Sequence, residues 1–294
     1  MPSLGPEERS SFERDGFVVV HGLLPAEYAR DLRRYVEELV VDRTSHGQAA
    51  ARYGEDGRPA ILKLNQLTET DARFQDLATR DEIVDVVESL LGAGARIFRD
   101  ALIVKPAGSQ GRFNYHQDAA YWDVDPPRFV SCWMALTDVP EDGSCLKVIA
   151  GSHDRRREHG LVVAGHPLPG AVTSGLRKLV TYAGTGDNPG RAGGNKGLWR
   201  AKRFVLGKAT RYVPALGDLQ DYRAVPAEVD MARERVLPLR MGDGVFFHGL
   251  TLHGSGPNDT AVDRIAPIIT YLSADARFVG AGNEDFRPAR RRPA

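Results

Sequence analysis

The stretch IFRDALIV, Ile97–Val104, is the first of several short apolar segments that predict a mainly β protein. The later segments are Phe113–Asp118, Phe129–Leu136, Cys145–Ile149, Val236–Leu239, Gly244–Phe247 and Ile265–Leu272. Short strands separated by turn residues at this spacing are typical of a β-sandwich or barrel. Within the series, Glu141-Asp142-Gly143 predicts a hairpin-type turn before the strand at Cys145–Ile149.

Helices are expected to flank this β region on its N-terminal side. They are predicted from Gly5, from Pro25 through Leu39, and over Asp81–Leu91, with strands at Gly16–Val20 and Ile61–Leu67 between them. The 294 residues show no internal repeat. A β-rich chain of this length commonly forms one domain, so we expect a single domain over residues 1–294.

Residues 165–234 interrupt the strand pattern with an irregular, glycine-rich segment that also carries Trp199 and Arg203. So long an irregular stretch inside a compact domain is typical of a functional lid or of a disordered loop. We interpret it as a lid-like insertion, because glycines permit backbone motion and closure would exclude water from a site beneath it.

Composition argues against several classes of function. Lys plus Arg and Asp plus Glu both number 39, so the net charge is zero and nucleic-acid binding is not expected. Two cysteines, Cys132 and Cys145, indicate buried free thiols rather than a secreted disulfide framework. The N-terminus has no signal core and no window has the length of a membrane span, so we expect a cytoplasmic protein that does not bind membranes. The sequence does not indicate an oligomeric state.

Two motifs far apart in the chain predict a metal site: Tyr115-His116-Gln117-Asp118 and Leu252-His253-Gly254-Ser255. Alternate residues of a strand face the same side, so His116 and Asp118 are expected to point into one interior. A His-x-Asp pair followed by a distant His is the ligand order of the two-histidine, one-carboxylate triad. Such a triad holds Fe(II) and leaves positions open for a co-substrate and O2.

His248 also fits the spacing of the distal ligand. We prefer His253, because the glycines that follow it place it at the expected end of a strand, where a barrel opens. The other histidines, namely His21, His46, His153, His159 and His166, are interpreted as satisfied core or surface residues. Arg264, beyond the distal histidine, is suited to clamp a carboxylate through two hydrogen bonds.

These motifs resemble those of the phytanoyl-CoA dioxygenase family of Fe(II)/2-oxoglutarate-dependent oxygenases. The matching residues are His116-Gln117-Asp118, Trp133, Ser144-Cys145-Leu146, Gly151-Ser152-His153, Gly242–His248, His253–Asn258 and Arg264. The resemblance covers about residues 10–275, and residues 165–234 match it poorly. Ser144 is a departure, since the family usually has glycine there; we expect this change to affect a turn and not the metal.

The resemblance implies a double-stranded β-helix core, also called a jelly roll or cupin-like fold, with flanking helices. It implies that the catalytic centre is an iron site with His116, Asp118 and His253 as metal ligands. The cofactors implied are Fe(II), the co-substrate 2-oxoglutarate and O2. The expected co-substrate contacts are Arg264, Ser255, Gln117, Trp133 and Lys63. For Trp133 a plain core role remains equally open.

On this resemblance we expect an enzyme that oxidises a C–H bond of a small molecule, most simply by hydroxylation, while 2-oxoglutarate gives succinate and CO2. The alternatives are epimerisation, desaturation or oxidative ring closure with the same cofactors, or a non-catalytic binding protein. Asp118 is the carboxylate that related halogenases lack, so halogenation is not expected. The unusual lid-like insertion, together with an Arg- and Ala-rich composition that suggests a GC-rich bacterial source, points to specialised-metabolite biosynthesis. Candidate substrate contacts are Arg112, Asn114, Tyr121, Trp122, Asp123, Trp199 and Arg203.

Overall fold

The structure is a computed structural model, and it describes residues 4–54, 57–122, 124–163, 166–167, 222–279 and 286–290. Most of the predicted lid, residues 165–234, lies outside the described residues. Its last part, from Tyr222 to Glu234, lies inside them and consists of short ordinary elements.

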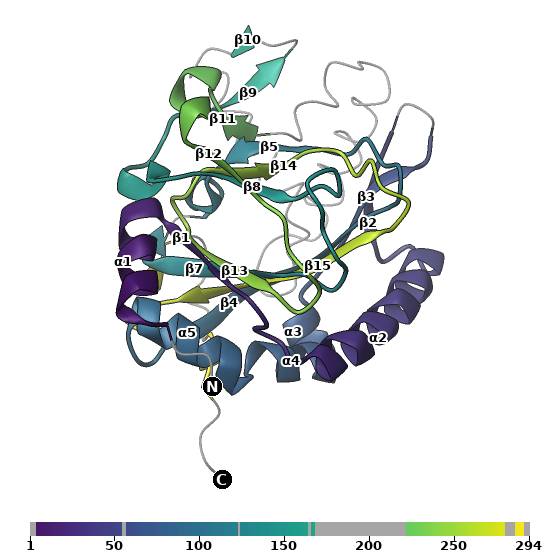
Figure 1. The fold of residues 1–294 in the computed structure, drawn as a ribbon, viewed down its shortest axis with the longest axis horizontal. Helices are drawn as coiled ribbons and strands as arrows, with labels where there is room; N and C mark the ends of the chain where they lie inside the picture. Colours follow the sequence, from purple (N-terminus) through teal and green to yellow (C-terminus); the bar gives the residue numbers. More distant parts are fainter. Residues whose placement is uncertain are drawn as a thin grey trace.

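Two antiparallel sheets form the body of the protein (Figure 1). Across the larger sheet the strands are β1 (Phe17–Val20), β13 (Gly244–His248), β7 (Phe129–Met134), β15 (Arg264–Leu272), β4 (Arg96–Lys105), β3 (Pro59–Asn65) and β2 (Ala50–Tyr53). Across the smaller sheet they are β12 (Glu234–Leu237), β8 (Leu146–Ile149), β14 (His253–Ser255) and β5 (Phe113–His116). Strands distant in sequence are neighbours in both sheets, as in a jelly roll. The predicted mainly β fold with a double-stranded β-helix core is confirmed.

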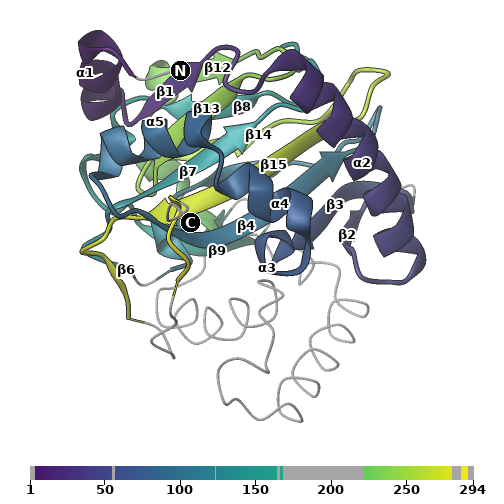
Figure 2. The same cartoon turned by 90° about the horizontal axis from the view of Figure 1, so that it is seen from below.

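Helices cover the outer face of the larger sheet. They are α2 (Ala26–Ser45), α3 (Leu67–Thr70), α4 (Ala72–Ala78) and α5 (Asp81–Leu91), while α1 (Pro6–Asp15) lies beside β1. Figure 2 shows α2, α4 and α5 in front of that sheet. The formation of α5 follows from its sequence: two acidic residues occupy its first turn, and its apolar residues recur at helical spacing until Gly92 ends it.

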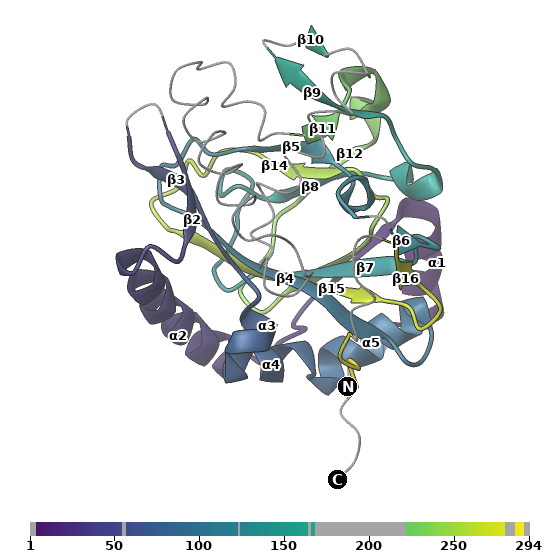
Figure 3. The ribbon, with the colours of Figure 1, turned by 180° about the vertical axis from the view of Figure 1, so that it is seen from behind.

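Smaller elements complete the described chain. They are the 3-10 helices η1 (Asp118–Ala120), η2 (Ser152–Asp154), η4 (Pro226–Glu228) and η5 (Met231–Arg233), the sheet of β9 (His159–Val163), β10 (His166–Pro167) and β11 (Tyr222–Ala224), and the pair β6 (Val124–Asp125) and β16 (Arg277–Phe278). Figure 3 shows β9 to β11 beyond the smaller sheet, next to β5.

The larger sheet is buried on both faces, which explains the continuous apolar run of β7. On β7, Val130, Cys132 and Met134 belong to the core that the helices cover. Trp133 belongs instead to a second core between the two sheets, together with side chains of β8 and β13. Because strand residues alternate, the residues that share the face of Trp133 point toward the interior between the sheets.

The strand boundaries differ from the predictions at the metal motif. β5 ends at His116 and Asp118 begins η1, so the two residues do not alternate along one strand as predicted. His253 begins β14 rather than ending a strand. The cause is local: Gln117 is still extended, and the 3-10 turn after it changes the direction of the chain.

Other elements were predicted incorrectly or not at all. The turn at 141–143 does not close a hairpin, because it joins β7 of the larger sheet to β8 of the smaller one. The sequence also missed α3, α4 and β2, which are short and, for β2, half-exposed without an apolar run. Both cysteines are buried and free, as predicted. Among the described residues, no helix combines the length and the apolar character needed to cross a membrane.

Candidate active site

The structure brings together the three residues of the predicted triad. His116 at the end of β5 pairs directly with His253 at the start of β14. Oδ1 of Asp118 lies 3.9 Å from Nε2 of His116 and 3.7 Å from Nε2 of His253, and the three ligand atoms all lie within 4.8 Å of one another. An octahedral ion with bonds of about 2.1 Å places adjacent ligands about 3 Å apart. For the three groups to share one ion, Oδ1 of Asp118 would have to approach each histidine nitrogen by less than about 1 Å.

The two histidines are held in the tautomer that a metal requires. Nδ1 of His116 donates to the carbonyl of Asn114 (2.8 Å), and Nδ1 of His253 donates to the carbonyl of Thr251 (3.0 Å). Nε2 of each ring therefore keeps a lone pair, which is the arrangement of a metal-ligating histidine. Burial and the neighbouring His253 also hold the pKa of His116 well below its ordinary value, so its neutral form is favoured.

Ser131 on β7 orients the carboxylate of Asp118. Its hydroxyl donates to Oδ2 of Asp118 (2.8 Å) and also shares a hydrogen bond with Oγ1 of Thr270 on β15 (2.9 Å). With Oδ2 occupied, Oδ1 is the oxygen that faces both histidines. The sequence analysis missed Ser131, although alternation along β7 places it on the same buried face as Trp133.

Gln117 lies between two ligands in sequence, but its side chain is bonded to the protein backbone. Nε2 donates to the carbonyls of Arg155 (2.9 Å) and Leu250, and Oε1 accepts from the Arg157 N–H (2.8 Å). Its own N–H donates to Nε2 of His159 (2.9 Å). These bonds use both amide hydrogens and hold the segment that carries the ligands. The predicted contact of Gln117 with the co-substrate stays a prediction.

Arg264 begins β15 and is buried, with 3% of its surface exposed. It shares the face of Ala266, toward the interior between the sheets, and its guanidinium carbon lies 5.5 Å from the centre of the Trp133 ring. Nε and one terminal nitrogen have no hydrogen-bond partner among the described residues. Burial lowers the pKa of Arg264 to about 10. A buried guanidinium with unpartnered donors is a binding point for a carboxylate.

Lys105 is a functional candidate that the sequence analysis missed. It is the last residue of β4, is fully buried and pairs directly with Arg264 across the β4–β15 ladder. Its Nζ donates to Oγ of Ser255 (2.8 Å), a predicted co-substrate contact that is itself buried. The alternation of side chains along β4 could have indicated its orientation. Leu102 and Val104 pack under the helices, so Lys105 must face the opposite side of the sheet.

The other residues predicted to contact the co-substrate or the substrate differ in how closely they approach the triad. Lys63 on β3 is close enough to His116 for its positive charge to help lower the pKa of that histidine. The Tyr121 ring lies 5.5 Å from that of His116, edge to face. Trp122 packs in an aromatic cluster with Phe98 and Phe129. Asp123, Trp199 and Arg203 lie outside the described residues.

His248 does not approach the triad. It lies on the face of β13 opposite Val245 and Phe247, which pack between the sheets. Its Nδ1 accepts from the Leu250 N–H (3.1 Å), and its ring lies 5.7 Å from that of His153. The structure therefore groups His253, and not His248, with the other two candidate ligands.

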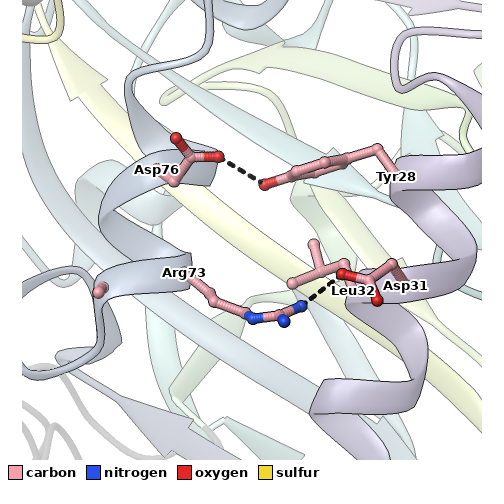
Figure 4. Close-up of a pocket in the computed structure, with 6 residues that line it drawn as sticks. Tyr28, Asp31, Leu32, Arg73 and Asp76 are labelled. Atoms are coloured by element: carbon pink, nitrogen blue, oxygen red, sulfur yellow. Dashed lines mark hydrogen bonds and ion pairs between the residues drawn. The ribbon is translucent and has the colours of Figure 1, made fainter.

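A separate surface groove lies between α2 and α4 (Figure 4). Across it, Tyr28 donates to Asp76 (3.2 Å) and Arg73 forms an ion pair with Asp31 (2.5 Å). These contacts join two helices on the outer face of the larger sheet. The groove is a seam between helices, and none of its lining residues comes from an element that carries the triad.

Comparisons with known proteins agree with this geometry. A model of the phytanoyl-CoA dioxygenase (PhyH) family matches residues 12–266. The peroxisomal phytanoyl-CoA dioxygenase of Homo sapiens is 25% identical over 285 residues, which cover 93% of this chain and 70% of that one.

Solved structures show the same fold. The epimerase SnoN, in complex with Fe3+, alpha ketoglutarate and nogalamycin RO, superposes with a TM-score of 0.61 at 19% identity, over 98% of this chain and 95% of that one. The alpha ketoglutarate-dependent carbocyclase SnoK from nogalamycin biosynthesis gives a TM-score of 0.62 at 19% identity, over 97% and 87%. At such identity these likenesses show the fold alone. The family match spans most of the sequence, so this chain belongs to the phytanoyl-CoA dioxygenase family of iron- and 2-oxoglutarate-dependent dioxygenases.

Proposed function

We propose that this protein oxidises a C–H bond of a small molecule, with hydroxylation as the outcome, and that His116, Asp118 and His253 hold its iron. One observation carries the proposal: three candidate ligands converge on one point, and the buried Arg264 has guanidinium donors that find no partner in the described part of the chain. A binding protein that had lost catalysis would need neither feature.

The residues present fit the cofactors of the family. Two imidazole nitrogens and one carboxylate oxygen form the donor set of the Fe(II) facial triad. Two nitrogens of Arg264 without a partner among the described residues fit the distal carboxylate of 2-oxoglutarate, and Ser255 is a buried hydroxyl bonded to Lys105, which pairs with Arg264 across the β4–β15 ladder. Trp133 contributes a buried aromatic wall beside Arg264.

Iron held by His116, Asp118 and His253 would, together with 2-oxoglutarate and O2, supply the oxidising power, with succinate and CO2 as the co-products. The protein residues supply position and dryness rather than proton transfer. Carbonyl groups fix the two imidazoles and Ser131 fixes Asp118, so the ligand atoms are arranged before a metal arrives. The apolar side chains between the sheets limit the water around the candidate centre.

The substrate is proposed to be an intermediate of bacterial specialised metabolism. Support comes from the composition and from the likeness of fold to two proteins described as acting in that kind of chemistry, an epimerase and a carbocyclase. The same likeness supports epimerisation and oxidative ring closure as second candidates. The carboxylate of Asp118 supports all of these outcomes over halogenation.

Binding of the cofactors is tested first, without a substrate. Protein made anaerobic and mixed with Fe(II) and 2-oxoglutarate is expected to show a metal-to-ligand charge-transfer band in the visible range. His116→Ala should abolish the band by removing a metal ligand, and Arg264→Met should weaken it by removing the carboxylate contact. His248→Ala is the matched control and should keep the band, because His248 lies on the other face of β13. A wild-type protein without any band contradicts the proposal.

Turnover is tested next with a panel of biosynthetic intermediates, scored by release of succinate in the presence of O2. The mass of the product then separates the outcomes. Hydroxylation adds an oxygen, desaturation and oxidative ring closure remove two hydrogens, and epimerisation leaves the mass unchanged. Succinate release that persists in His116→Ala would show that the triad is not the catalytic centre.

A further inference from the structure

Lys105 is a buried lysine whose acceptors are all neutral. Its Nζ donates to Oγ of Ser144 (2.8 Å), Oγ of Ser255 (2.8 Å) and the carbonyl of Gly256 (2.7 Å). The side chain has no exposed surface. Lysine is almost never fully buried unless it is paired, and none of these acceptors carries a charge.

Among the described residues, the charged groups that act on Lys105 are all cations. The groups whose charge shifts its pKa are Arg264 on β15, Arg52 on β2 and Arg112, which precedes β5. Burial, with these three cations, lowers the pKa of Lys105 to about 5, so the amine is neutral at pH 7 as long as no anion binds beside it. Buried like charges without a counter-ion are unfavourable. The pair of Lys105 and Arg264 therefore lacks a partner that a carboxylate would supply.

Ser144 has a strained backbone conformation that places its hydroxyl in the hydrogen-bond network of Lys105. Its φ is +62°, in the left-handed region that favours glycine, which explains why glycine is usual at this position. Here the serine hydroxyl donates to the carbonyl of Gly256 (2.7 Å) and accepts from Lys105. The expectation that Ser144 affects only a turn is too narrow, since the side chain anchors Lys105. Unfavourable backbone conformations persist where the surrounding structure uses them.

The hydrogens in the network can be assigned. The proton of Ser144 goes to Gly256, so Ser144 can only accept from Lys105. A neutral amine has two hydrogens and one lone pair, and the Ser255 hydroxyl can then donate to Nζ. An ammonium has three hydrogens, one for each acceptor, so Ser255 must accept from it. The Ser255 hydroxyl proton then has no acceptor among the described residues and is free for a ligand.

We propose that Lys105 is a positioning residue for the distal carboxylate of the co-substrate. It takes up a proton from solvent as the dicarboxylate binds beside Arg264, and the ammonium so formed turns the Ser255 hydroxyl into a donor to that carboxylate. The negative charge of the distal carboxylate then lies between the Arg264 guanidinium and the Lys105 ammonium. This inference rests on the proposed function, because the ligand is the co-substrate of that function.

The experiment is calorimetric titration of nickel-loaded protein with 2-oxoglutarate at pH 7, in two buffers of different ionisation enthalpy. Wild type is expected to take up close to one proton for each 2-oxoglutarate bound. Lys105→Met should take up none and should bind at least tenfold more weakly, with nickel affinity unchanged. Lys147→Met is the matched control: Lys147 lies on β8 between Leu146 and Val148, which point inward, and it should behave as wild type.

Stability gives a second readout that a merely structural role would not produce. Without co-substrate, Lys105→Met should melt at the same temperature as wild type or higher, because it removes a buried amine that has to lose its proton when the chain folds. A lower melting temperature together with unchanged affinity for 2-oxoglutarate would make Lys105 a structural residue and overturn the proposal.

The failures are distinguishable. Wild type that does not bind 2-oxoglutarate contradicts the proposed function itself. Wild type that binds it without proton uptake overturns only the role of Lys105, and this measurement does not depend on whether any variant folds. Equal affinity and equal proton uptake in wild type and Lys105→Met would also overturn it.

Discussion

The Ser131 hydroxyl donates a 2.8 Å hydrogen bond to Oδ2 of Asp118, and Oδ1 of the same carboxylate faces Nε2 of both His116 and His253. Ser131 belongs to the larger sheet, whereas the two histidines belong to the smaller one. The orientation of the carboxylate therefore depends on how the two sheets are stacked. The geometry of a metal centre built in this way depends on the packing between the sheets as well as on its own ligands.

Replacing Ser131 should weaken metal binding without unfolding the protein. In Ser131→Ala, Asp118 loses the bond that selects Oδ1 for the metal, and the loss of such a supporting contact commonly lowers metal affinity by about 10–100-fold. Titration with Fe(II) or Ni(II) measures the change. Thr270→Val is the control, because it removes the other partner of Ser131 and leaves the bond to Asp118. Equal metal affinity in Ser131→Ala and wild type would contradict this role.

Gln117 is expected to matter for stability rather than for the co-substrate. Gln117→Met keeps the volume but leaves the carbonyls of Arg155 and Leu250 and the Arg157 N–H without their partner. A buried group left unpaired costs about 1–3 kcal/mol. Only the bond to Leu250 is fully buried, and water can replace part of the other two, so the free energy of unfolding should fall by about 2–4 kcal/mol in total. Affinity for 2-oxoglutarate, measured at saturating metal, should be unchanged. A selective loss of that affinity would support the co-substrate contact predicted from the sequence.

The backbone at Gly249 is predicted to have no room for a side chain. A Cβ there would lie 2.1–2.5 Å from ring atoms of the buried Phe129, and the Gly249 carbonyl accepts from the Ala119 N–H in η1 (2.9 Å). Gly249→Ala should therefore displace η1, which carries Asp118, and destabilise the fold by about 2–3 kcal/mol as overpacking does. Gly256→Ala is the control, since nothing lies within 4 Å of its added Cβ. Equal melting temperatures for the two variants would contradict the prediction.

Local sequence patterns predicted most strands of the two main sheets and the grouping of His116, Asp118 and His253. Apolar runs such as Phe129–Leu136 indicate a buried strand, because both faces of β7 are covered. The spacing of His116, Asp118 and His253 was informative because a shared metal requires these residue types together. Asp118 shows the limit of local reasoning: the structure groups it with the two histidines as expected, but it lies in a 3-10 turn rather than on the predicted strand.

Residues whose role depends on which strands are neighbours were not predictable. Lys105 acquires its role from lying opposite Arg264 in the β4–β15 ladder, and Ser131 from the stacking of β7 over η1. A sequence shows the side on which such residues point but not what lies on that side. The sequence showed Ser144 only as a departure from the family pattern. The role of its hydroxyl became visible in the structure, where Lys105 and Gly256 lie beside it.

His248, which competed with His253 as a candidate ligand, should instead make the stability of the protein depend on pH. Burial, with smaller effects from His153 and Arg128, lowers the pKa of His248 to about 4. In the unfolded chain a histidine titrates near pH 6.5, so between about pH 6.5 and about 4 the unfolded state binds more protons than the folded state. Stability from this residue is fully present above that window and declines as the pH falls through it.

The test is to compare wild type with His248→Asn, in which Oδ1 can still accept from the Leu250 N–H but does not titrate. Other groups titrate in the same window, so the informative quantity is the difference in unfolding free energy between the two proteins at each pH. On going from pH 7 to pH 4, the unfolding free energy of wild type should fall relative to that of His248→Asn by at most about 3 kcal/mol. Denaturant unfolding at several pH values measures it. Parallel curves for the two proteins would show that His248 is protonated as readily in the folded state as in the unfolded one.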